Sequence, residues 1–192
     1  MTRRSLGTGA ALALIAMFLA LVALGVHQAA RGVRLPLSNA SIIREQAAKK
    51  HLDPALIAAV IYAESKFEPR PSSAGAEGLM QILPATAYYL AHLSGGTRFT
   101  ASDLATPRVN VAYGSYYLRY LLDHYGGNEM LAVAAYNGGL SNVDHWVAQA
   151  NAAGRELTPE AIPFPETREY VQRVLAAQQA YRATYAQELG IQ

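Results

Sequence analysis

The sequence has 192 residues, a length that suits one folded domain plus a short appendage. Hydrophobic residues make up 52% of it and the formal net charge is only +2, which argues for a packed core and against a disordered chain or a nucleic-acid-binding protein. There are no cysteines, which excludes a disulfide scaffold, a zinc site with thiolate ligands and a lipid anchor on cysteine.

The first predicted element is an uncharged apolar run over residues 6–26. At about 1.5 Å per residue, a helix of this length spans about 30 Å, the thickness of the hydrocarbon core of a bilayer. Arg3 and Arg4 precede the run, as is typical of an N-terminus that stays in the cytoplasm. We therefore predict a transmembrane signal anchor. A cleaved signal peptide is the alternative, because Ala23-Leu24-Gly25 offers a passable cleavage site.

The anchor divides the chain into segments: a tail at 1–5, the anchor at 6–26, a linker at 27–38 and a folded domain at 39–190. No segment of the domain shows the alternation of a strand, so we expect it to be almost entirely helical. The predicted helices begin at Ser38 or Asn39, Asp53-Pro54, Pro84, Thr106-Pro107, Asn128, Ser141 and Glu166, and the Ser141 helix is expected to end near Trp146, before a loop at 150–159.

The second helix carries a carboxylate in an unusual place. Asp53 can accept backbone N–H bonds as the N-cap and Pro54 suits the first helical position. Glu64 falls on the apolar stripe formed by Ile57, Val60 and Ile61. Removal from water raises the pKa of a carboxyl group, and the negative end of the helix dipole acts in the same direction. The position suits a general acid, although a surface Glu paired with Lys or Arg is the plainer alternative.

The helix that follows Thr106-Pro107 is rich in tyrosine. Packing is the ordinary role of such side chains, and lining a sugar-binding cleft is the alternative, since amphipathic rings stack on pyranose faces and donate hydrogen bonds. The residues concerned are Tyr113, Tyr116, Tyr117, Tyr120 and Tyr125.

A series of motifs resembles the catalytic domain of the soluble lytic transglycosylases, a family related to goose-type lysozyme that cleaves the glycan strands of peptidoglycan. The first part is E-S-x-F-x-P at 64–69, with G-A-x-G-L-M-Q at 75–81 and P-x-T-A at 84–87. The others are D-L-x-x-P-x-x-N-x-x-x-G at 103–114, A-Y-N-G-G at 135–139 and I-P-F-x-E-T-R-x-Y-V at 162–171. The resemblance covers about residues 39–185 and implies a mainly α, lysozyme-like domain with little or no sheet.

The resemblance also implies roles for particular residues. Glu64 matches the catalytic acid/base, and either Ser72 or Ser73 matches a loop serine that orients it, because the loop is one residue shorter than is usual in the family. The remaining matches are expected to contact the sugar chain: Gln81, Leu83, Tyr136, Asn137 and Glu160. No metal or other cofactor is implied, and the expected partners are peptidoglycan and, through the N-terminal helix, the membrane.

The motifs contain one secure carboxylate, whereas ordinary glycosidases use two. The resemblance therefore implies that the substrate supplies the nucleophile and that the product ends in 1,6-anhydromuramic acid. The alternatives are a hydrolytic muramidase like the goose-type enzymes and a non-catalytic peptidoglycan-binding module.

Overall fold

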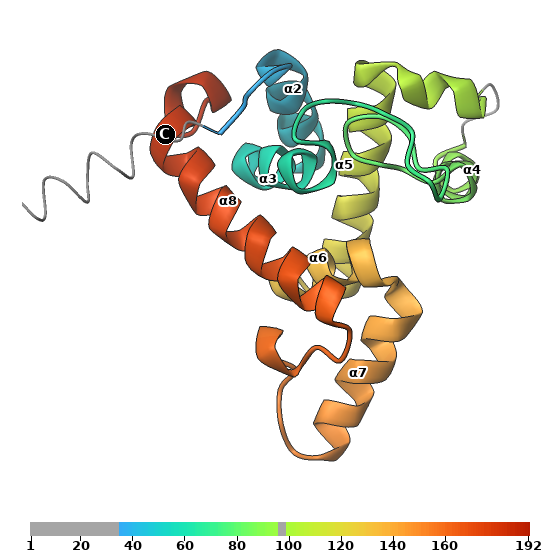
Figure 1. Ribbon diagram of the computed structural model, residues 1–192, viewed down its shortest axis with the longest axis vertical. Coiled ribbons are helices and arrows are strands. Elements are labelled where there is room, and N and C mark those ends of the chain that lie inside the picture. The colour runs from blue at the N-terminus through green and yellow to red at the C-terminus, as the bar shows by residue number, and fades with distance from the viewer. Residues whose placement is uncertain (1–34, 96–98) are drawn as a thin grey trace, which may run out of the picture. The chain divides into compact units, whose positions relative to one another are not determined.

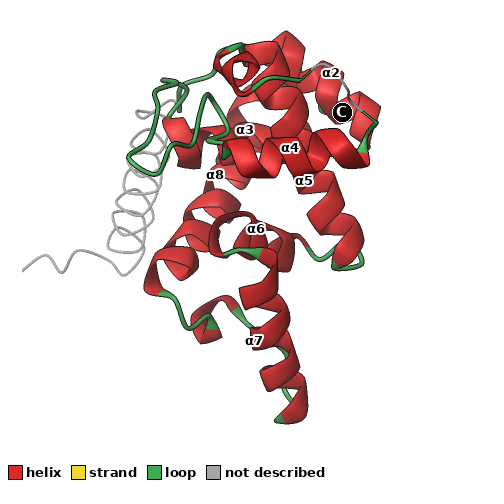
Figure 2. Ribbon diagram, turned by 90° about the vertical axis from the view of Figure 1, so that its right-hand side faces the viewer, coloured by secondary structure: helices red, strands yellow, loops and turns green. Residues whose placement is uncertain are grey.

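The computed structural model describes residues 35–95 and 99–192, and its regular elements there are helices joined by loops (Figures 1 and 2). The elements are α2 (Ala40–Lys50), α3 (Pro54–Ser65), α4 (Pro84–Leu93), the 3₁₀ helix η1 (Ala101–Ala105), α5 (Pro107–His124), α6 (Glu129–Gly138), α7 (Leu140–Ala152), the 3₁₀ helix η2 (Pro159–Ala161) and α8 (Pro165–Leu189). Pairing of the β type is limited, in this part of the chain, to an isolated bridge between Glu77 and Ile82. The prediction of a mainly α domain is confirmed.

Short-range capping signals place most of the helix starts as expected. The Asp53 side chain accepts a hydrogen bond from Ala55 N (3.0 Å), and Pro54 occupies the first turn of α3. Asn128 caps α6 by accepting from Leu131 N (3.1 Å). These bonds satisfy backbone donors that a helix N-terminus otherwise leaves without a partner.

The chain differs from the expectation at α7, which continues to Ala152 instead of ending near Trp146. The segment after Trp146 is rich in alanine, the residue with the strongest helix propensity, and the chain turns only at Gly154, with φ of 65°. The predicted loop at 150–159 is therefore shorter, and it leads into the unpredicted 3₁₀ helix at Pro159–Ala161.

The centre of the domain is α3, which is buried nearly all round. Residues 55–61 each have at most 1% of their surface exposed, so the helix has no solvent-facing side along that stretch. This agrees with its composition, because a helix that is apolar all round belongs in a core. The apolar surface of α3 is therefore wider than the single stripe that we expected. Helix α8 covers one side of α3, and α2 contacts it as well (Figure 1).

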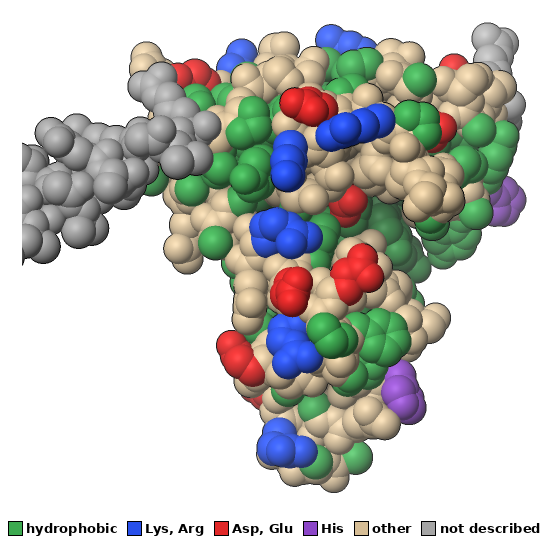
Figure 3. All heavy atoms as spheres, viewed as in Figure 1, with side chains coloured by type: hydrophobic (Ala, Val, Ile, Leu, Met, Phe, Trp, Pro, Cys, Tyr) green, Lys and Arg blue, Asp and Glu red, His purple; other side chains and the backbone are tan. Residues whose placement is uncertain are grey.

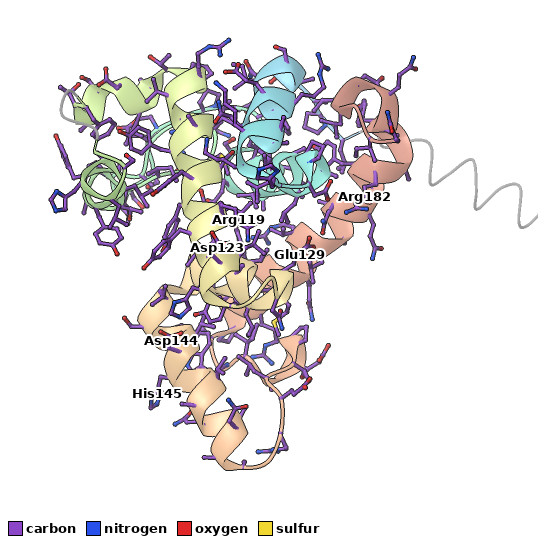
Figure 4. The ribbon with its side chains drawn as sticks, turned by 180° about the vertical axis from the view of Figure 1, so that it is seen from behind. Arg119, Asp123, Glu129, Asp144, His145 and Arg182 are labelled. Carbon is purple, nitrogen blue, oxygen red and sulfur yellow. The ribbon has the colours of Figure 1, made fainter. Side chains whose placement is uncertain are left out.

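Helices α3 and α8 run antiparallel, since contacts along α8 follow α3 in reverse order. At the start of α3, Asp53 Oδ2 accepts hydrogen bonds from Arg182 Nη2 (2.9 Å) and Gln178 Nε2 (2.7 Å). Gln178 Nε2 also donates to Glu129 Oε2 (3.1 Å) of α6; Figure 4 labels Glu129 and Arg182 in a view from behind. At the other end of α3, Glu64 meets Tyr170. The register of the two helices is therefore held at both ends.

The predicted anchor at 6–26 lies outside the described residues. Among residues 35–95 and 99–192, no helix combines the length and apolar character needed to cross a membrane. On the face shown in Figure 3, basic and acidic side chains are interspersed, as the small net charge leads one to expect.

Candidate active site

Glu64 lies in the last turn of α3, partly buried beside α8. The Tyr170 hydroxyl donates a hydrogen bond to Glu64 Oε1 at 2.7 Å. Burial raises the pKa of Glu64 to about 7, and Glu166 also raises it, while the Tyr170 hydrogen bond and the Arg173 charge partly offset this increase. The expected direction of the pKa shift is confirmed, and it leaves a carboxyl group that can give and take a proton near neutral pH.

The loop after α3 is fastened to the helix that carries Glu64. Ser65 Oγ donates to the carbonyl oxygen of Leu79 (2.8 Å), and the chain leaves α3 through Lys66 and Phe67, which both adopt left-handed conformations with φ of 53° and 64°. A pocket of about 240 Å³ opens between the helix end and the loop. Its lining includes Glu64, Lys66, Glu68, Arg70, Ser72 and Gln81.

Asn110 of α5 holds the second half of this loop. Its side chain is fully buried, its Oδ1 accepts from Met80 N (2.8 Å), and its Nδ2 donates to the carbonyl oxygens of Glu77 (2.7 Å) and Leu104 (3.0 Å). Gly78 has φ of 75°, and a Cβ there would lie 2.2 Å from Asn110 Nδ2. Glycine is therefore required at this position by both its conformation and the close approach.

The structure separates the two candidate serines. Ser72 lines the pocket, and its Oγ accepts from Ala76 N (2.9 Å), whereas Ser73 is exposed and is not part of the lining. Gln81 also lines the pocket; it has φ of 47°, and its Nε2 donates to the carbonyl oxygens of Arg70 and Gly78, both at 2.8 Å. Leu83 precedes α4 with 43% of its surface exposed, an unusual position for a large apolar side chain.

Tyr136 and Asn137 lie at the C-terminal end of α6. The Tyr136 hydroxyl donates to the carbonyl oxygen of Met80 (2.9 Å), and both burial and the Glu64 charge raise the pKa of Tyr136 well above 10. Asn137 Oδ1 accepts from the Thr167 hydroxyl (2.8 Å) of α8. Tyr136 therefore joins the motif at 75–81 to the neighbourhood of Glu64, and Asn137 joins α6 to α8.

Glu160 is placed apart from these groups. It is exposed on the short helix η2 and does not line the pocket that contains Glu64. Metal binding has no obvious location either, since in the described ranges no three His, Asp or Glu side chains gather closely enough to hold an ion.

Two of the four tyrosines of α5, Tyr117 and Tyr120, line a second pocket, of about 360 Å³, together with Tyr89 of α4. The Tyr117 ring lies 5.4 Å from that of Tyr136 and stacks on Tyr120 at 6.4 Å. The Tyr120 and Tyr89 hydroxyls are 3.3 Å apart. This pocket therefore adjoins Tyr136 and offers aromatic faces and hydroxyl groups. Tyr113 and Tyr116 of α5, and Tyr125 just after the helix, do not line it.

Sequence reasoning missed Tyr170 and Asn110 as parts of the site. Each of them enters the sequence analysis only as a position in a matched motif. Tyr170 lies in the motif at 162–171 and Asn110 in the motif at 103–114, so the available signal was their place in these motifs.

Comparison with known proteins agrees with this geometry. The sequence model of the Transglycosylase SLT domain matches residues 41–158, and that of the Soluble lytic transglycosylase helical domain matches residues 161–191. The chain is 34% identical over 154 residues to the soluble lytic murein transglycosylase of Escherichia coli K12, covering 78% of this chain and 24% of the relative. It is 38% identical over 106 residues to the transglycosylase of Enterobacteria phage PRD1, covering 55% of this chain and 36% of the relative.

Solved structures show the same likeness. An inactive mutant of the lytic transglycosylase Slt from Pseudomonas aeruginosa has a TM-score of 0.70 and 33% identity over 82% of this chain and 25% of that one. The 70-kDa soluble lytic transglycosylase of Escherichia coli has a TM-score of 0.75 and 32% identity over 82% of this chain and 26% of that one. The described chain thus spans about a quarter of the length of these relatives. The family-model match over most of the chain shows that it belongs to the transglycosylase SLT domain family.

Proposed function

We propose that this protein is a peptidoglycan lytic transglycosylase that cleaves the β-1,4 bond between N-acetylmuramic acid and N-acetylglucosamine. The observation that carries the proposal is Glu64, a carboxyl group with a pKa of about 7 that lines a pocket and accepts a hydrogen bond from Tyr170. Membership of the family and the names of the relatives support the choice of substrate.

In the proposed reaction, protonated Glu64 delivers its proton to the glycosidic oxygen as the bond between this oxygen and the anomeric carbon breaks. The acetamido group of the muramic acid stabilises the cationic centre that forms. The C6 hydroxyl then attacks the anomeric carbon and returns its proton to Glu64, so that the acid is regenerated without the use of water. A pKa near 7 suits both steps, because one group must act first as an acid and then as a base.

The other matched residues would bind the sugar chain. Gln81 and Ser72 line the same pocket as Glu64, and the exposed Leu83 offers an apolar contact nearby in sequence. Tyr136 fastens the backbone of Met80, next to Gln81, and Asn137 is held by Thr167. Ser73 and Glu160 are both exposed, and Glu160 would contact sugar only if the strand extends to η2.

The product distinguishes this reaction from hydrolysis. A hydrolase needs a second carboxylate to activate water. Glu68 lines the same pocket as Glu64, but its side chain is exposed and its Oε2 lies 3.4 Å from Arg70 Nη2. We therefore predict 1,6-anhydromuramoyl ends when purified sacculi are digested, which mass spectrometry detects as muropeptides lighter by one water. Reducing muramic ends alone would identify a muramidase, and binding without any release would identify a non-catalytic module.

We also propose that residues 6–26 anchor the protein in the cytoplasmic membrane, with residues 27–38 as the linker and the domain at 39–190 on the side of the cell wall. The support is the length of the uncharged run and the location of the proposed substrate. N-terminal sequencing of protein from cell membranes is expected to find the run still attached. A mature N-terminus near Val26 would instead indicate a cleaved signal peptide.

A further inference from the structure

A further pocket, of about 310 Å³, lies beside the second half of α7, where the following loop and the short helix η2 close it. We call it the α7–η2 pocket. Its lining combines the indole ring of Trp146 with a cation, Arg155, an anion, Glu156, and two neutral polar side chains, those of Gln149 and Thr158. It shares no residue with the pocket of Glu64, so it is a separate site that the proposed reaction does not use.

The walls of the α7–η2 pocket are held in place by the backbone. Arg155 N donates a hydrogen bond to the carbonyl oxygen of Ala150 (3.0 Å), which folds the start of the loop against the last turns of α7. Ala161 N donates to the carbonyl oxygen of Thr158 (3.0 Å) and closes the turn of η2. Trp146 is only 5% exposed, so its ring is fixed by packing. The pocket is therefore formed before any ligand arrives.

The two charges of the pocket have no counter-charge of their own. Arg155 and Glu156 are exposed, and neither belongs to any of the ion pairs in the described ranges. A ligand that carries a carboxylate and an amino group would meet a partner for each, and opposite charges side by side also fix its orientation. An uncharged sugar would use neither. The lining thus suits a small peptide or amino acid better than a bare glycan.

Trp146 also connects the pocket to the motif that contains Tyr136 and Asn137. A Cβ at Gly138 would lie 3.3 Å from Cη2 of Trp146, so the indole ring packs against the backbone directly after Asn137. On the other side, η2 contributes Ala161 to the pocket and also carries Glu160, which the family resemblance places on the sugar chain. The pocket therefore lies between two segments that are expected to contact the substrate.

We propose that the α7–η2 pocket binds a peptide stem of peptidoglycan, with Arg155 on a carboxylate group and Glu156 on an amino group of the peptide. This inference rests on the proposed function, whose substrate carries short peptides on its muramic acid residues. These peptides have free carboxylate groups and, on their diamino acid, a free amino group, whereas the glycan chain between them has neither. The pocket would therefore favour strands that keep their peptides, and it would act on binding rather than on the chemical step.

A binding measurement tests the pocket directly, because Trp146 is the only tryptophan of the sequence and gives a single indole N–H signal in NMR. Peptide stems released from sacculi by an amidase are the probe. We expect them to displace this signal saturably in the parent protein, with affinity about 2–5-fold weaker in Arg155→Gln, since exposed ion pairs contribute modestly. Peptide-free glycan strands should leave the signal in place.

Arg108→Gln is the matched control for this titration. Arg108 is also exposed, but it lies on α5 and pairs with Glu45, and it lines none of the three pockets described above. This variant should bind the peptide stems as the parent protein does. The proposal would be overturned if the stems left the indole signal of the parent unchanged, if peptide-free strands displaced it equally, or if Arg155→Gln and Arg108→Gln bound the stems with the same affinity.

Kinetics on soluble glycan strands test the partner assigned to Glu156. Acetylation of the peptide amino groups removes their charge, so it should raise KM about 2–5-fold for the parent protein and leave kcat unchanged. Glu156→Gln should show the raised KM already, with no further increase on acetylation, because both changes remove the same contact. Glu169→Gln, an exposed acid of α8, should respond to acetylation as the parent does. Independent, additive effects of acetylation and Glu156→Gln would contradict the contact.

The two measurements separate this inference from the proposed function. The indole titration does not depend on turnover. A parent protein that binds the stems but releases nothing from sacculi would overturn the proposed function and leave the peptide site in place. A parent protein that produces anhydromuramoyl ends, but whose indole signal does not respond to the stems, would overturn the peptide site alone.

Discussion

Replacement of Glu64 with Gln is expected to lower turnover on peptidoglycan by about 10²–10⁴-fold or more, because the amide has no proton to deliver to the leaving oxygen. Gln has nearly the same shape, and its carbonyl oxygen can still accept the hydrogen bond that Tyr170 donates to Oε1. The loss should therefore appear in kcat rather than in binding. Release of soluble muropeptides from sacculi measures it.

The same variant should be more stable than the parent at alkaline pH. Burial raises the pKa of Glu64 from the usual 4.5 to about 7, so the folded chain binds this proton more tightly than the unfolded chain does. The favourable contribution is complete below about pH 4.5 and is lost as pH rises through about 7, a change of up to about 3 kcal/mol in the free energy of unfolding. Gln does not titrate, so urea unfolding at pH 5 and pH 8 should differ less in Glu64→Gln.

Glu169→Gln provides the control for both measurements, because Glu169 is exposed on α8 beside Tyr170. It should retain the turnover and the stability profile of the parent, since an exposed carboxylate is solvated in both states. If Glu64→Gln turned over peptidoglycan as fast as the parent protein, Glu64 would be excluded as the acid. A large loss of stability at every pH would instead identify Glu64 as one half of a structural ion pair.

Local signals account for the parts of the fold that could be predicted. The starts of α3 and α6 follow from Asp53, Pro54 and Asn128, whose effects act within one turn of chain. The end of α7 could not be found in this way. Trp146 is buried against neighbouring elements, but the helix continues through an alanine-rich segment that no stop signal interrupts before Gly154.

In the candidate site, too, some features follow from local sequence signals and others depend on distant parts of the chain. The spacing of apolar neighbours marks Glu64 as an acid in an unusual place, but its role as acid/base follows from the resemblance of the motif at 64–69 to the lytic transglycosylases. Tyr170 is 106 residues away in sequence, and its contact depends on the register of α3 against α8, which no local pattern encodes. The choice between Ser72 and Ser73 likewise required the path of the loop, because adjacent residues point in different directions.

Asn110 shows how much of the site is held from outside the pocket. Its one side chain satisfies three backbone groups, those of Met80, Glu77 and Leu104. The groups of Met80 and Glu77 belong to the loop between α3 and α4. In the same loop, the carbonyl oxygen of Leu79 accepts a hydrogen bond from Ser65 and that of Met80 accepts one from Tyr136. Asn110 thus holds the backbone on both sides of Leu79, the residue through which Ser65 attaches the loop to α3, the helix that carries Glu64.

Asn110→Ala is therefore expected to cost about 3–9 kcal/mol of the free energy of unfolding, because each of the three buried backbone groups that loses its partner costs about 1–3 kcal/mol. This is a large share of the stability of an ordinary domain. Turnover should fall about 10-fold or more in the molecules that remain folded, because Gln81 is displaced from the pocket. Denaturant unfolding, with turnover measured below the unfolding transition, separates the two effects.

Asn128→Ala is the control, because it removes one exposed capping bond and should cost only about 1 kcal/mol of the free energy of unfolding. A loss of stability in Asn110→Ala no larger than this would contradict the role assigned to Asn110.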